Sequence, residues 1–204
     1  MQITFPIRNH SIDLLKFICA VLVIFLHTDW KYRDMILPFT RCAVPCFLMI
    51  SGFLLYNEGQ IGCTKIKRTI VKILKITLWA TLLFLLFKEC IFFVANKSFY
   101  IPSLHSIVNW VLFNECPFAY HLWYLYAYIY VLLVILLFER FNRLKFLFLI
   151  TPFLLLCDLI LGKYGMLMLG INLEPFYIRN WIFVGIPYFS LGCIIKHYVV
   201  CVGG

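Results

Sequence analysis

The chain has 204 residues, of which 64% are hydrophobic and 13% are charged, and its formal net charge is +9. This composition excludes an ordinary soluble domain, in which about half of the residues are apolar and about a quarter are charged. The basic residues lie between apolar runs and no nucleic-acid-binding motif is present, so the charge indicates orientation in a lipid bilayer and no nucleic-acid partner.

Six apolar stretches are long enough, or nearly long enough, to cross a bilayer. They lie at about 12–29, 39–57, 73–95, 119–138, 146–162 and 179–196. Because backbone polar groups find no water in hydrocarbon, each stretch is expected to be a helix. The sequence therefore predicts an all-α protein, a polytopic transmembrane bundle of about six spans. We expect a single domain over residues 1–204 with an uncleaved first span.

Basic residues alternate from one linker to the next. The second linker, the fourth linker and the C-terminal end carry most of them: Lys65, Lys67, Arg68, Lys72, Lys75, Arg140, Arg143, Lys145 and Lys196. The other three linkers are mixed or nearly neutral. By the positive-inside rule, both termini are expected in the cytoplasm. The predicted location is the cell membrane, as a multi-pass protein of a bacterial inner or plasma membrane.

The first span carries a lysine near one end and a histidine at the other. At 3.6 residues per turn, Asp13, Lys16 and His27 share one helix face, and Lys16 and His27 stand roughly 16–17 Å apart. The two side chains cannot touch, so any joint role extends through the depth of the membrane. Taken alone, Lys16 could simply extend its long side chain to the inner membrane interface, with Asp13 as its neighbour. His27 could likewise be a water-exposed residue at a helix end.

Further polar residues lie in or beside the later spans. Arg41, His121 and Asp158 fall near the predicted outer face, and Ser51 lies deeper in the second span. Each also fits an interfacial or topological role. No cysteine pair has the spacing of a zinc or redox site, so no metal is expected.

Group transfer is the chemistry that suits this layout. A histidine, whose unperturbed pKa is near 6.5, can take a proton from a sugar hydroxyl. Basic residues at the inner end of the first span can hold an anionic donor, such as one that carries phosphates.

Four blocks of the chain resemble the membrane acyltransferase-3 family. "SIDLLKFICAVLVIFLH" (11–27) resembles its first-helix signature, an Arg or Lys and a His separated by ten residues. "TRCAVPCFLMISGFLLY" (40–56) is similar to the second-helix block with Ser-Gly-Phe. "HLWYLYAYIYVLLVI" (121–135) resembles the His-Leu-Trp block, and "IPYFSLGCIIKH" (186–197) is similar to a later block with Leu-Gly.

The resemblance implies transfer of an acyl group, commonly acetyl from acetyl-CoA, to a hydroxyl of an envelope saccharide, glycolipid or related acceptor. Acyl-CoA is then a donor substrate, and no bound cofactor is expected. Lys16 and His27 fall on the catalytic motif, with His27 as the catalytic residue, and Ser51, His121 and Trp123 fall on matching blocks as substrate-site residues. Three further substrate-site candidates come from position: Asp13, Arg41 and Asp158.

Members of this family usually have about ten spans, so a chain of about six is expected to correspond to the N-terminal part of the family fold. Two alternatives to an active enzyme stay open at this point. One is a truncated, non-catalytic family member, and the other is a small transporter. Transport would favour broken spans at matching places in two halves, and the sequence has no such symmetry.

Overall fold

The computed structural model describes residues 10–29, 31, 33–57, 59–170 and 173–202. Within these ranges the chain is helical and forms no strand, apart from a single bridge between Asn57 and Gln60. Six helical segments are long and apolar enough to cross a membrane. The prediction of an all-α bundle with six spans is confirmed.

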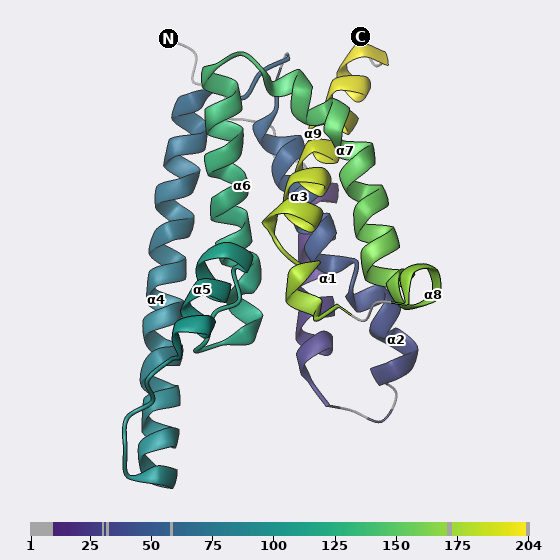
Figure 1. Ribbon diagram of the computed structural model, residues 1–204. Coiled ribbons are helices and arrows are strands. Elements are labelled where there is room, and N and C mark those ends of the chain that lie inside the picture. The colour runs from purple at the N-terminus through teal and green to yellow at the C-terminus, as the bar shows by residue number, and fades with distance from the viewer. Residues whose placement is uncertain (1–9, 30, 32, 58, 171–172, 203–204) are drawn as a thin grey trace.

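The spans contain these elements in chain order (Figure 1). They are α1 (His10–His27), α2 (Arg33–Thr40) with α3 (Ala43–Leu55), α4 (Cys63–Asn96), η1 (Tyr120–Leu122) with α6 (Trp123–Arg140), α7 (Leu144–Asp158) with η2 (Leu159–Lys163), and η4 (Trp181–Gly185) with α9 (Ile186–Val202). Three shorter elements lie between them: α5 (Leu104–Phe113), α8 (Gly165–Leu169) and η3 (Pro175–Tyr177).

Two boundaries differ from the sequence prediction. The basic run 65–75, predicted as a linker, forms the first turns of α4. Ile66, Ile70 and Ile73 recur there at helical spacing and pack on the core, which extends the helix beyond the apolar run. The predicted linker before the fourth span contains α5, which is capped at its start because the Ser106 backbone N–H donates to Ser103 Oγ at 3.2 Å.

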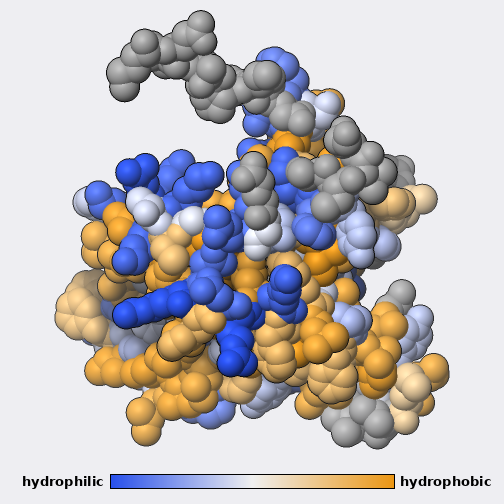
Figure 2. Space-filling model, turned by 90° about the horizontal axis from the view of Figure 1, so that it is seen from above, coloured by the Kyte–Doolittle hydropathy of each residue, from blue (hydrophilic) through white to orange (hydrophobic). Residues whose placement is uncertain are grey.

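The two ends of the bundle differ in polarity. The start of α4, the α6–α7 turn and the end of α9 lie together at one end, drawn at the top of Figure 1. We call this the basic end, because it carries the exposed side chains Lys65, Lys67, Arg68, Arg140 and Arg143. Figure 2 looks onto this end and shows hydrophilic side chains gathered over its middle, with hydrophobic side chains around them. That the basic end faces the cytoplasm stays a prediction from charge.

Helices α3 and α9 touch backbone to backbone. A Cβ atom at Gly52 would stand 2.0 Å from the Phe189 carbonyl oxygen, and one at Gly192 would stand 1.9 Å from the Met49 carbonyl oxygen. The Cys193 thiol donates across the same crossing to the Gly52 carbonyl at 3.5 Å. Small residues permit this approach between membrane helices, where dispersion contacts replace the hydrophobic effect as the source of attraction.

The remaining spans are arranged around this pair. Helix α1 packs on α3, α7 packs on α9, and α6 packs on η4, where Gly185 leaves room for the Val131 side chain. Helix α4 packs on α6, and the hydroxyls of Thr81 and Tyr126 hydrogen-bond between them. Since α4 is attached chiefly through α6, the α4–α6 group lies to one side of the α3–α9 pair (Figure 1).

A methyl group at the α3–α9 crossing is expected to destabilise the whole bundle. Gly192→Ala would force the two backbones apart and should cost about 3 kcal/mol, the upper part of the usual range for overpacking. The measurement is the midpoint of thermal unfolding in detergent. Gly62→Ala is the matched control, because Gly62 has φ −58° and open space where its Cβ would lie. Equal midpoints for the two variants would contradict the close crossing.

Candidate active site

Two histidines that are far apart in the sequence meet at the end of the bundle opposite the basic end. His27 is the last residue of α1, and His121 is the middle residue of η1. Their ring centroids are 5.7 Å apart and the rings are inclined at 63°. Both residues are exposed. The structure thus brings together two of the residues that the sequence predicts for the site.

The short turn η1 and one phenylalanine of α4 position His121. The Leu122 backbone N–H donates to the Ala119 carbonyl at 3.0 Å, and both of these residues are buried in a small cluster. The Phe84 ring meets the His121 ring edge to face at 4.5 Å between centroids. An edge-to-face pair of this kind limits rotation of the imidazole.

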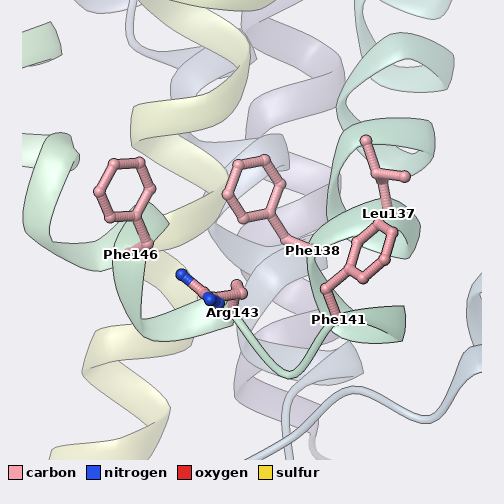
Figure 3. A pocket seen from close by; sticks show the side chains of 5 residues that line it. All are labelled: Leu137, Phe138, Phe141, Arg143 and Phe146. Atoms are coloured by element: carbon pink, nitrogen blue, oxygen red, sulfur yellow. The ribbon is translucent and has the colours of Figure 1, made fainter.

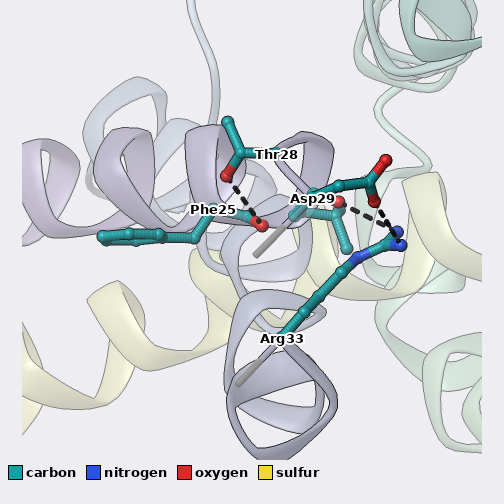
Figure 4. Close-up of polar contacts among 5 residues, drawn as sticks. Phe25, Thr28, Asp29 and Arg33 are labelled. Carbon is teal, nitrogen blue, oxygen red and sulfur yellow. Dashed lines mark hydrogen bonds and ion pairs between the residues drawn. The ribbon is translucent and has the colours of Figure 1, made fainter. Parts of the chain in front are cut away.

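The turn after α1 fixes the helix end that carries His27 (Figure 4). Arg33 donates through Nη2 to the Leu26 carbonyl at 3.3 Å and through Nη1 to Asp29 Oδ1 at 3.1 Å. Thr28 Oγ1 donates to the Phe25 carbonyl at 3.4 Å. The last carbonyls of a helix have no partner within the helix, so Thr28 and Arg33 satisfy the carbonyls of the two residues that precede His27.

The histidine pair can act on one substrate oxygen. With centroids 5.7 Å apart, an oxygen between the rings can lie within hydrogen-bonding distance of both. A neutral imidazole carries one donor and one acceptor nitrogen, so one ring can accept a proton while the other orients or polarises the reacting group. The arrangement fits acid–base chemistry on a hydroxyl or a carbonyl.

Lys16 and Asp13 form a separate pair nearer the basic end. Lys16 Nζ lies 3.6 Å from Asp13 Oδ1, and the two side chains are 39% and 35% exposed. Both residues lie on the helix that ends at His27. The pair is therefore part of α1 without being part of the histidine site.

Asp158 belongs to a third group, at the same end of the bundle as the histidines. It ends α7, and Arg179 and Tyr188 lie close enough to interact with it electrostatically. Gly162 lies beside this group, and a Cβ atom there would stand 3.1 Å from Ile178 Cγ2 and 3.8 Å from Asp158 Oδ1. Arg179 is exposed, and Asp158 is half-buried.

The three remaining predicted residues lie in structural positions around these groups. Ser51 donates from Oγ to the Phe47 carbonyl at 2.8 Å. Arg41 is exposed at the corner between α2 and α3. Trp123 begins α6, is packed against the main core, and its carbonyl accepts from Asn114 Nδ2 at 3.2 Å. Trp123 therefore contributes to packing, and Ser51 hydrogen-bonds within α3.

Metal ligands do not cluster in the described ranges. No group of three or more His, Cys, Asp or Glu residues there could hold a metal ion. Eight cysteines of those ranges are free thiols: Cys19, Cys42, Cys46, Cys63, Cys90, Cys116, Cys157 and Cys193.

A family model described as an acyltransferase domain matches residues 9–200. The chain belongs to this acyltransferase family. The match spans all six membrane segments and the residues of the histidine site, which confirms the resemblance that the four sequence blocks carry. The protein is thus a multi-pass membrane member of an acyltransferase family.

One curated relative is a serine/alanine racemase of Enterococcus gallinarum, with 33% identity over 137 residues. The matched stretch covers 60% of this chain and 18% of that protein. The chain therefore spans less than a fifth of that relative's length. No solved structure matches the chain.

Sequence reasoning missed two residues that shape this candidate site, Phe84 and Arg33. Phe84 is one of many aromatic residues in an apolar run, and nothing local distinguishes it. Arg33 did carry a signal, because Asp29 lies four residues before it at a helix-pair spacing. Its bond to the Leu26 carbonyl joins the start of α2 to the end of α1, across seven residues of sequence.

Replacing Phe84 is expected to loosen His121 without unfolding the protein. Phe84→Leu keeps an apolar side chain but removes the edge-to-face contact, which is worth about 0.5–1.5 kcal/mol. We expect turnover in an acyl-transfer assay to fall about two- to tenfold at unchanged accumulation in the membrane. Phe87→Leu is the matched control on the same helix, because Phe87 is 61% exposed. The same loss in both variants would contradict the role of Phe84.

Proposed function

We propose that the protein is a membrane O-acyltransferase that moves an acyl group, with acetyl as the first candidate, from acyl-CoA to a hydroxyl of an envelope saccharide or glycolipid. The observation that carries this proposal is the meeting of His27 and His121 at 5.7 Å in a chain of the acyltransferase family. Transfer to a hydroxyl needs a base beside the nucleophile, and an exposed imidazole supplies one.

His27 acts in this proposal as the general base. Its imidazole takes the proton of the acceptor hydroxyl while the hydroxyl oxygen attacks the thioester carbonyl carbon. The carbon–sulfur bond then breaks, the ester remains on the acceptor, and the coenzyme A thiolate leaves and takes up a proton. His121, held by Phe84, hydrogen-bonds to the reacting oxygen and orients it.

The donor enters from the basic end. Its phosphates are anionic and stay near water, where the exposed lysines and arginines of α4 and of the α6–α7 turn supply positive charge. Lys16 lies between that end and His27, with Asp13 holding its ammonium group at 3.6 Å. The roughly 16–17 Å between Lys16 and His27 along α1 is then the depth over which the donor extends.

The acceptor enters from the opposite end, beside the histidine pair. Asp158 and Arg41 offer a carboxylate and a guanidinium at that end, and both groups suit hydrogen bonding to sugar hydroxyls. Trp123 and Ser51 complete the candidate substrate site from α6 and α3. The proposed location is the cell membrane, with this end turned away from the cytoplasm.

Substitution of His27 tests the proposal directly. His27→Gln keeps a hydrogen-bonding side chain but cannot shuttle protons near neutral pH, so transfer should fall about 10²–10⁴-fold. The measurement is incorporation of labelled acetyl from acetyl-CoA into envelope saccharide by membranes of equal protein content. His105→Gln, in exposed α5, is the matched control and should retain the parent rate.

Substitution of Lys16 tests donor binding separately from the catalytic step. Lys16→Ala should raise the KM for acetyl-CoA more than it lowers kcat, and Lys16→Arg should restore part of the loss. Parent-level transfer by His27→Gln would show that His27 is structural. Absence of transfer by the parent protein would favour the non-catalytic alternative.

A further inference from the structure

A cavity at the basic end is separate from the histidine site. It has a volume of about 450 Å³ and lies at the turn between α6 and α7. Its lining consists of Leu137, Phe138, Phe141, Arg143 and Phe146 (Figure 3). Four of these five side chains are apolar, and the fifth is a cation. The proposed acyl transfer uses the positive charge of this end in general, but none of the four apolar side chains.

The backbone of the turn holds this lining in place. Asn142 has φ +53°, the Asn142 N–H donates to the Glu139 carbonyl at 3.0 Å, and the Arg143 N–H donates to the Phe138 carbonyl at 2.8 Å. These two bonds form a Schellman motif, which ends α6 at a defined residue. Arg143 is therefore fixed next to Phe138 before α7 begins.

The aromatic rings are open to the surroundings of the bundle. Phe141 is 66% exposed, and Phe146 is 51% exposed. The rings of Phe138 and Phe146 are parallel within 6°, with centroids 6.2 Å apart. Figure 3 shows the Arg143 side chain below and between these two phenylalanines. Rings exposed at the end of two membrane spans lie where acyl chains meet headgroups.

The cavity carries a positive charge from Arg143. Glu139 is the one acidic residue in the segment 137–148, and its carboxylate accepts from the Ile61 backbone N–H at 3.0 Å. Among the residues that the structure describes, the Arg143 guanidinium has no carboxylate partner within ion-pair distance. Arg140 and Lys145, which flank the cavity, are exposed and add positive charge.

We propose that this cavity binds one anionic phospholipid, with the lipid phosphate on Arg143 and an acyl chain against the phenylalanine rings. A guanidinium is a favourable partner for phosphate, and basic pockets between spans at the cytoplasmic side suit anionic headgroups. The nucleotide part of acyl-CoA fits less well, because a single polar side chain in the lining leaves the base and the ribose without partners.

Lipid titration of the purified full chain tests this site. The protein in neutral detergent is titrated with phosphatidylglycerol or phosphatidylcholine, and bound lipid is counted by native mass spectrometry. The parent should bind one phosphatidylglycerol at least about tenfold more tightly than phosphatidylcholine, since both lipids carry the phosphate but the choline cation is repelled by the basic residues around the cavity. Arg143→Gln should remove most of this preference. Arg140→Gln, in the same turn but outside the lining, should keep it.

Competition distinguishes the sources of phosphate. Excess acetyl-CoA and millimolar inorganic phosphate should leave phosphatidylglycerol bound. Displacement by acetyl-CoA would overturn the proposal and make the cavity a donor site, and displacement by inorganic phosphate would reduce it to an anion site. Equal preference for phosphatidylglycerol in the parent and in Arg143→Gln would also overturn it. The thermal unfolding midpoint in phosphatidylcholine checks that Arg143→Gln is folded.

Discussion

The backbone contact between α3 and α9 is the constraint on which the bundle depends. Gly52 and Gly192 face the opposite helix at positions where even a methyl group would overlap a carbonyl oxygen. Phe189 and Leu48 are fully buried beside the crossing. Since lipid chains are as apolar as leucine, this close fit, rather than exclusion from water, holds the helices together. Helices α1 and α7 then pack on the outer sides of the pair.

The geometry of the histidine site depends on this helix packing. His27 stands on α1, which α3 holds, whereas His121 stands on η1 before α6, which η4 and α4 hold. The two rings therefore belong to different groups of helices, and the distance between the rings depends on how those two groups pack together. Arg33 hydrogen-bonds to the end of α1 that carries His27, and Phe84 packs against the ring of His121. A substrate between the rings would bridge the two groups.

The spans could be predicted because the length of an apolar run is a local property of the sequence, and this length decides whether a helix can cross a bilayer. The shared face of Lys16 and His27 followed from helical spacing in the same way. The start of α4 at Cys63 did not follow, because it depends on isoleucines that pack on distant helices. Gly52 was visible in a Ser-Gly-Phe block, but its physical role requires Gly192, 140 residues later. The Phe84 contact with His121 is equally non-local.

The central claim is that His27 and His121 act together on one substrate oxygen. The most direct measurement compares acetyl-transfer rates of His27→Gln, His121→Gln and the double variant in membranes of equal protein content. Residues that act as a unit show strongly non-additive losses. The account predicts that the double variant is about as slow as His27→Gln alone. Losses that multiply in the double variant would contradict it, because two independent sites would then be at work.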